Sequence, residues 1–219
     1  MKFKLIVFDW DGTLMDSEAR IVDSIRSAFA DVGEPPPSRQ VARNVIGLGL
    51  DEAMSVLWPE GGERQRSRVV ERYRHHFFRA NDQPSDLFPG ALEVLDWLQA
   101  RGYLLGVATG KSRRGLEAVL EDTGLKHRFH ATRCADEAGS KPHPEMLRQL
   151  MAELGVRPGD TLMVGDTEYD MELAHNAGAS ALAVCYGVHE PERLLRHRPL
   201  DCLASLTEIP RWLEPGARI

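Results

Sequence analysis

Residues 5–14 read Leu-Ile-Val-Phe-Asp-Trp-Asp-Gly-Thr-Leu, an apolar run that ends in two acidic residues and a glycine. The run predicts a buried strand, and the glycine predicts the turn that ends it. Side chains two positions apart on an extended segment point the same way, so Asp9 and Asp11 should share one crevice at the strand's carboxyl end. Two carboxylates so close repel each other unless a cation neutralises them or one takes a proton. The pair therefore predicts either a bound hard metal ion or acid–base chemistry.

The composition is that of an ordinary folded protein. The chain has 219 residues, of which 42% are hydrophobic and 27% charged, and its formal net charge is −6. This acidic balance disfavours nucleic-acid binding, which needs a dense basic face. The apolar run before Asp9 is too short for a signal peptide or a membrane span, so we expect a cytoplasmic protein that does not bind membranes. The cysteines lie far apart in the sequence and are expected to be reduced and mostly buried; they are Cys134, Cys185 and Cys202.

A helical unit is predicted directly after the first strand. Between residues 16 and 83 apolar residues recur at helical spacing, and glycine turns separate the stripes. The sequence Asn-Asp-Gln-Pro at 81–84 would close the unit. Because the unit is inserted directly after the first strand, it should lie over the carboxylates as a lid that selects the substrate. We assign residues 16–83 to a cap domain, and residues 1–15 with 84–219 to a core domain.

The core pattern is that of the α/β class. After residue 88, short apolar runs alternate with helical patterns, which is typical of a doubly wound parallel sheet. Strands are predicted at 104–108, 129–132, 161–164 and 181–185, and helices near 91–100, 113–122, 144–154 and 168–177. With the opening strand this predicts a Rossmann-like parallel sheet of five strands with an inserted α-helical cap.

Polar residues follow three of the later strands. At 109–112 the sequence Thr-Gly-Lys-Ser offers a hydroxyl and the free amides of a helix start, which can hold a phosphate oxygen. Lys141 comes just before another helix, and Asp166 and Asp170 form a second acidic pair. Ligands of open α/β sheets bind at the carboxyl ends of the strands, so these groups should meet the first pair there.

These segments resemble the four motifs of the haloacid dehalogenase-like hydrolase superfamily, in its phosphoglycolate phosphatase-like branch with a helical cap. Residues 9–13 are similar to the first motif, 109–110 to the second, 141–142 to the third and 165–170 to the fourth, in the family's order. One motif alone would be a weak signal, but the four cover essentially the whole chain. Trp10 stands where leucine or methionine is more usual, and this departure touches no catalytic group.

The resemblance implies a phosphatase that acts on a small phosphorylated metabolite through an aspartyl-phosphate. Asp9 would attack phosphorus, and Asp11 would protonate the leaving group and then deprotonate water. Mg²⁺ would be bound by a carboxylate oxygen of Asp9, the backbone carbonyl of Asp11 and the side chain of Asp166. A turn-forming pair that caps a helix is the plainer alternative for the two acids.

The resemblance also assigns the groups around the phosphoryl oxygens. Thr109, Gly110 and Lys141 would bind the phosphoryl group, and Thr109 and Lys141 would stabilise its charge. Asp170 would orient Lys141 or a metal-bound water. The alternatives are a helix cap for Thr109, a solvated surface lysine for Lys141, and a first-turn acid favoured by the helix dipole for Asp170.

Most other functions account for fewer of these residues. Residues 106–112 nearly match the P-loop of a nucleotide-dependent kinase, but three residues stand where the motif requires four. A dehalogenase would need no acid at position 11, and a non-catalytic binding module would be expected to have lost part of the set. A phosphoryl mutase would share Asp9 and Asp11 and stays open.

The leaving group stays open: a phosphoglycolate-like ester or a sugar phosphate is favoured, and nucleotides and other small esters are handled by proteins of similar sequence pattern. Arg43 and Asn44, in the loop 43–49 between two helices, are the candidates for binding it, because their side chains could meet a carboxylate or hydroxyls. An ordinary helix turn is the alternative interpretation of this loop.

Overall fold

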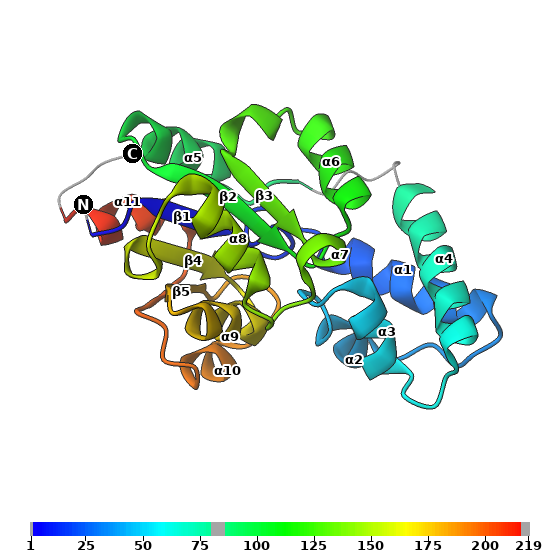
Figure 1. Cartoon of the computed structure of the whole chain (residues 1–219). Coiled ribbons are helices and arrows are strands. Elements are labelled where there is room, and N and C mark those ends of the chain that lie inside the picture. Colours follow the sequence, from blue (N-terminus) through cyan, green and yellow to red (C-terminus); the bar gives the residue numbers. More distant parts are fainter. Residues whose placement is uncertain (1, 80–85, 216–219) are drawn as a thin grey trace.

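The computed structural model describes residues 2–79 and 86–215, and a parallel β-sheet lies at its centre (Figure 1). The described strands are β1 (Leu5–Phe8), β2 (Leu104–Thr109), β3 (Ala131–Cys134), β4 (Thr161–Gly165), β5 (Ser180–Val184) and β6 (Cys202–Leu203). Their order is β3-β2-β1-β4-β5-β6, and all neighbouring pairs are parallel. The carboxyl ends of β2, β1 and β4 therefore lie side by side.

Helices cover both faces of this sheet. One face carries α5 (Ala91–Ala100), α6 (Arg113–Asp122) and α11 (Ile209–Leu213), and the other carries α8 (Glu145–Leu154) and α9 (Glu168–Ala177). Side chains of β1 alternate between the two faces, with Ile6 and Phe8 on the first and Leu5 and Val7 on the second. All four are inaccessible to solvent, as expected for a central strand of a parallel sheet.

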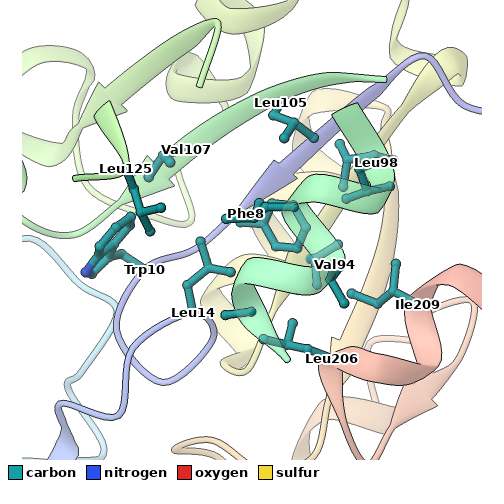
Figure 2. Packing of buried hydrophobic residues seen from close by; sticks show 14 of the residues in the cluster. Phe8, Trp10, Leu14, Val94, Leu98, Leu105, Val107, Leu125, Leu206 and Ile209 are labelled. Atoms are coloured by element: carbon teal, nitrogen blue, oxygen red, sulfur yellow. The ribbon is translucent and has the colours of Figure 1, made fainter. Parts of the chain in front are cut away.

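The core on the α5 face fixes the direction of the two acids after β1. Phe8 and Trp10 are both buried in this cluster, where Phe8 packs with Val94 of α5 (Figure 2). Neighbouring residues of an extended chain face opposite sides. The anchoring of Phe8 and Trp10 therefore turns Asp9 and Asp11 toward the other side, where α8 and α9 begin.

Four helices between β1 and α5 form a separate group, called the cap below. They are α1 (Glu18–Asp31), α2 (Arg39–Arg43), α3 (Leu50–Leu57) and α4 (Glu63–Arg79), drawn in blue to cyan in Figure 1. They have their own hydrophobic cluster, in which Ile25, Phe29 and Val69 are buried. The division of the chain into two domains stays a prediction, and its boundary at 81–84 lies outside the described residues.

The predicted fold class is confirmed, with one more strand than expected. Predicted strands match β2, β4 and β5 closely, whereas the one predicted at 129–132 lies two residues too early. β6 and three short helices, α7 (Ala135–Ala138), α10 (Pro191–Leu195) and α11, were not predicted, because two to five residues carry too little pattern. The described 3₁₀ turns are Lys126–Arg128, Pro158–Asp160 and Leu206–Glu208. Within the described ranges no helix is both long and apolar enough to cross a bilayer.

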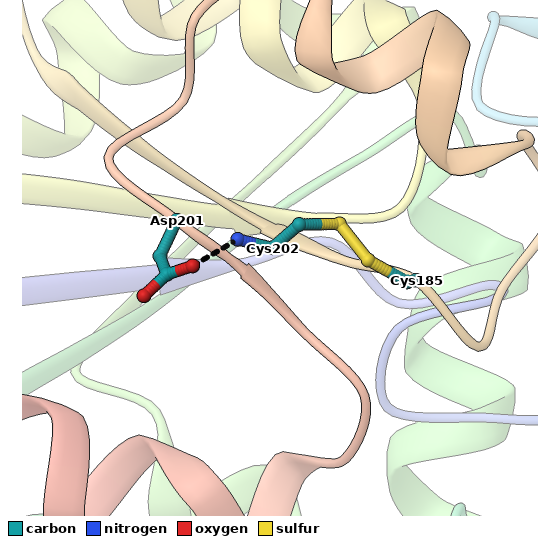
Figure 3. Close-up of a disulfide and its surroundings, with 3 residues drawn as sticks. All are labelled: Cys185, Asp201 and Cys202. Atoms are coloured by element: carbon teal, nitrogen blue, oxygen red, sulfur yellow. Dashed lines mark hydrogen bonds between the residues drawn. A yellow bond between two sulfur atoms is a disulfide. The ribbon is translucent and has the colours of Figure 1, made fainter.

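The prediction that all three cysteines are reduced is wrong for two of them. Cys185 and Cys202 form a disulfide (Figure 3), with Cα atoms 6.0 Å apart, whereas Cys134 is free and buried. The pairing depends on β6, which lies beside β5 so that the amide of Cys185 donates to the carbonyl of Leu203 at 2.9 Å. Because the local sequence pattern does not predict β6, it also does not predict that these two thiols lie close together.

Candidate active site

Most of the predicted site residues converge on the carboxyl-terminal edge of the sheet. Asp9 follows β1, Thr109 ends β2 and Asp166 follows β4, which are three neighbouring strands. Lys141 comes from the segment before α8, and Asp170 from the first turn of α9. All five are buried. The strand order thus brings together groups that are distant in the sequence.

Three of these carboxylates share one buried ammonium group. Asp9, Asp166 and Asp170 offer oxygens that lie within 4.8 Å of one another. Lys141 Nζ lies 2.8 Å from Asp9 Oδ1 and 2.6 Å from Asp170 Oδ1. Burial alone would lower the pKa of Lys141, but the charges of Asp170 and Asp9 outweigh it and raise this pKa. Three ionised carboxylates and one lysine leave two negative charges uncompensated, which favours a divalent cation or protonation.

Asp9 keeps one oxygen available. Its Oδ1 accepts a hydrogen bond from the amide of Trp10 at 2.6 Å and contacts Lys141, whereas Oδ2 is buried with no hydrogen-bond partner among the described residues. Burial raises the pKa of Asp9 well above its usual range, although Lys141 opposes this rise. A buried oxygen without a partner is unfavourable, so Oδ2 is suited to a metal ion or to attack on an electrophile.

Asp166 is held by hydrogen bonds but is not neutralised by them. Its Oδ1 accepts from Thr13 Oγ1 at 2.6 Å, and its Oδ2 accepts from the amide of Val188 at 2.8 Å. A Cβ at Gly12, where φ is +82°, would lie 2.1 Å from Oδ2, so only glycine fits there. Burial, followed by the charge of Asp170, raises the pKa of Asp166 to about 7.

Asp170 links the start of α9 to the buried lysine. Its Oδ2 accepts from the amide of Thr167 at 3.1 Å and from the Thr167 hydroxyl at 2.7 Å, which completes a capping box. Its Oδ1 accepts from Lys141 at 2.6 Å. Asp170 is therefore a helix-capping acid and also lies where it can orient Lys141.

Asp11 has a different set of partners. Its Oδ1 accepts from Ser17 Oγ at 2.5 Å and lies 3.0 Å from Lys111 Nζ. The Lys111 side chain is only 7% exposed, and its Nζ lies 4.6 Å from the centre of the Phe77 ring in the cap. Neither Ser17 nor Lys111 was predicted as a site residue, and the one signal for Lys111 was its place two residues after Thr109. A metal contact through the Asp11 backbone carbonyl stays a prediction.

The second predicted motif lies where β2 meets the cap. Thr109 Oγ1 accepts from the amide of Lys111 at 3.2 Å, so this hydroxyl also shapes the turn. A Cβ on Gly110 would lie 2.4 Å from the carbonyl oxygen of Leu48 and 2.6 Å from that of Gly47. Gly110 therefore lets the cap backbone rest directly on the core.

A cavity of about 90 Å³ lies between the cap and the strand ends. Its core side is formed by Asp9, Asp11 and the segment 110–112, and its other side by residues of α1, α3, α4 and the loop before α3. Both acids of the opening motif therefore face one cavity. The arrangement offers a nucleophile and a second acid beside a space for a small ligand.

Arg43 and Asn44 are not among the described residues that line this cavity. The Arg43 guanidinium lies 3.0 Å from Glu18 and 2.9 Å from Glu190, and the Asn44 carbonyl accepts from the Tyr169 hydroxyl at 2.8 Å. These contacts join the cap to the segments after β4 and β5. A role in binding the leaving group stays a prediction, which Arg43→Ala would test on a panel of phosphate esters.

Known proteins share both the sequence pattern and the fold. Residues 6–184 match the sequence model of a family described as haloacid dehalogenase-like hydrolase. "Probable phosphatase IndB" of Dickeya dadantii (strain 3937) is 35% identical, over 94% of this chain and 91% of its own length. A phosphoglycolate phosphatase of Mannheimia succiniciproducens is 32% identical, over 85% and 87%. The crystal structure of a predicted phosphoglycolate phosphatase from Haemophilus somnus has a TM-score of 0.88 at 28% identity, over 98% of this chain and 99% of that one. The chain therefore belongs to the haloacid dehalogenase-like hydrolase family, in its phosphoglycolate phosphatase-like branch.

Proposed function

We propose that this protein is a Mg²⁺-dependent phosphatase that hydrolyses a small phosphate monoester through an aspartyl-phosphate on Asp9. The observation that carries the proposal is the buried group of Asp9, Asp166 and Asp170 around Lys141, next to a cavity that Asp9 and Asp11 line. The family, and relatives named phosphatase and phosphoglycolate phosphatase, support this reaction class.

The donor set fits Mg²⁺. This hard cation prefers carboxylate and carbonyl oxygens, and here two negative charges lack compensation while Asp9 Oδ2 lacks a hydrogen-bond partner among the described residues. Asp9 and Asp166 would hold the ion together with the backbone carbonyl of Asp11. When bound, the ion would neutralise charge that develops on the phosphoryl oxygens.

In the first half of the reaction, Asp9 displaces the alcohol. A carboxylate oxygen of Asp9 forms a bond to phosphorus while the ester P–O bond breaks, and Asp11 gives a proton to the departing oxygen. Lys141 keeps its proton because its pKa is raised, so it places a fixed positive charge beside Asp9. Asp170 holds that ammonium group in position, and Thr109 adds its hydroxyl at the end of β2.

In the second half, water replaces Asp9 on phosphorus. Asp11 takes a proton from the water, the water oxygen bonds to phosphorus, and the bond from phosphorus to Asp9 breaks, so both acids return to their starting states. Ser17 and Lys111 both bind the same oxygen of Asp11, Oδ1, which leaves its second oxygen to give and take the proton.

The test is release of inorganic phosphate from a panel of esters, with Mg²⁺ and with a chelator. Asp9→Asn keeps the size of the side chain but removes the nucleophile, so kcat should fall by at least about a thousandfold, the scale of losing a covalent nucleophile. Asp16→Asn, at an exposed acid nearby, is the matched control and should keep full activity. Turnover by Asp9→Asn would contradict the mechanism. Transfer of the phosphoryl group to a second hydroxyl, without phosphate release, would instead identify a mutase.

A further inference from the structure

The cavity above Asp9 is polar on its core side and apolar on its cap side. Asp9, Asp11 and Lys111 stand at the core side. The cap side consists mostly of aliphatic and aromatic side chains, among them Ile25, Val45, Ile46, Tyr73, Phe77 and Phe78, called the apolar wall below. Among the described cap residues that line the cavity, Arg74 is the one charged side chain.

On this basis, and resting on the phosphatase function proposed above, we propose that the leaving group is a small apolar alcohol. It would be a benzylic or phenylalkyl alcohol that lies against the apolar wall, rather than a sugar or a hydroxy acid.

The aromatic part of the wall is well suited to a ring. Tyr73 and Phe77 stack with centroids 5.6 Å apart and planes at 24°, and Phe78 lies edge-on to Phe77 at 5.8 Å. Phe77 is further held by two cations over its ring, Lys111 Nζ at 4.6 Å and the Arg20 guanidinium at 4.4 Å. Aromatic rings pack favourably in offset-stacked or edge-to-face contact, so this cluster suits contact with a further ring.

Desolvation favours the same class of alcohol. An apolar leaving group gains free energy when it leaves water for this wall. A hydroxyl or carboxylate would lose its water without a matching number of partners, since the wall offers few donors and acceptors.

The size of the cavity sets an upper limit on the ligand. A volume of about 90 Å³ holds roughly six to nine waters when one water needs about 10–15 Å³ of such space. This volume is of the size of a single-ring alcohol, and it is too small for a nucleoside.

Arg74 has little to gain from binding a carboxylate on the leaving group. It is exposed, and it also lines a second, polar cavity together with the acids Asp51, Glu52 and Asp136. The charge of an exposed cation is screened by water, so it gains little from a carboxylate.

The first experiment compares esters of unactivated alcohols on the wild-type protein with Mg²⁺. Benzyl and 2-phenylethyl phosphate are compared with glycerol 1-phosphate and phosphoglycolate by kcat/KM. We expect the phenyl esters to exceed the polar esters by at least about tenfold, the scale on which apolar pockets discriminate. Equal or higher kcat/KM for the polar esters overturns this inference and leaves the phosphatase function standing. No phosphate release from these four overturns the inference, and none from the wider panel of esters overturns the phosphatase function as well.

The second experiment uses a matched pair of isosteric variants. Val45 lines the cavity, whereas Val22, on α1, is equally buried in the cap cluster but does not line it. Val45→Thr should lower the ratio of kcat/KM for benzyl phosphate to that for glycerol 1-phosphate severalfold, up to about tenfold, whereas Val22→Thr should leave the ratio unchanged. The ratio does not depend on how much of each variant is folded. An equal change in both variants, or none in Val45→Thr, overturns the inference, as does a preference for phosphoglycolate that Arg74→Gln removes.

Discussion

Asp166→Asn should make the metal-free protein more stable while it removes activity. The substitution keeps the size of the side chain and both of its hydrogen bonds, because the amide oxygen can accept from the amide of Val188 and the amide nitrogen can donate to Thr13 Oγ1. What it removes is one negative charge from a buried group of three carboxylates and one lysine.

The size of the effect follows from the pKa of Asp166. Burial raises this pKa from 3.8 to about 7, a shift of about three units that corresponds to about 4 kcal/mol. A raised acidic pKa means that the folded protein binds the proton more tightly than the unfolded chain. The folded state is therefore destabilised progressively as the pH rises from 3.8 to about 7, with the full effect above that range. Asn carries no such penalty, so the variant should gain about 4 kcal/mol at pH 8 and less than half of that at pH 5.

The assay is thermal unfolding with chelator present, at pH 5 and pH 8, on wild type, Asp166→Asn and the exposed control Asp16→Asn. For a chain of this length, about 4 kcal/mol corresponds to a rise in Tm of roughly 10 °C at pH 8. Added Mg²⁺ should raise the Tm of the wild type and act less on Asp166→Asn, which offers a neutral ligand. If Asp166→Asn unfolds at or below the wild-type temperature at pH 8 without metal, the reasoning from uncompensated charge is refuted.

Three further predictions concern the surroundings of the site. Gly110→Ala should raise KM or lower kcat at least about tenfold, because a Cβ would meet two cap carbonyls at 2.4 and 2.6 Å; the scale is that of slight misplacement of a site. Gly159→Ala, which has open space around its Cβ and no positive φ, is the control and should keep full activity. Lys111→Gln should lower kcat/KM about ten- to a hundredfold, because Asp11 loses its ion-pair partner; unchanged rates, alongside those of exposed Lys126→Gln, would contradict this role. Thiol titration without reductant should count no reactive thiol in the native protein at pH 8, since burial raises the pKa of Cys134 to about 12, and one after unfolding; three thiols after unfolding would contradict the disulfide.

The centre of the sheet could be predicted because each of its strands carries its own signal. β1, β2 and β4 are short apolar runs that end in polar residues, and both features lie within a few neighbouring positions. β6 has two residues and is defined by its pairing with β5, so no local sequence pattern predicts it. The disulfide was missed for the same reason.

The same distinction, between local signals and contacts made by distant segments, holds for single residues of the site. Asp9, Asp11 and Asp166 could be predicted from their positions at strand ends, where the topology of a parallel sheet brings them together. The contacts of Asp11 with Ser17 and Lys111 depend on how the chain turns after β1 and β2, and no spacing rule describes that. The amide of Val188 that holds Asp166 is backbone, so residue identity could not reveal it.

The apolar wall has a second consequence, which concerns how this protein can evolve. Ile25, Val45 and Ile46 line the cavity and are also members of the hydrophobic cluster that holds the cap together. A large-to-small change at such a position costs about 2–5 kcal/mol of stability, so a mutation that adapts the cavity to a new substrate also weakens the cap. Specificity should therefore change slowly in nature, and directed evolution of new substrates should succeed more often when stabilising mutations elsewhere in the chain are introduced first.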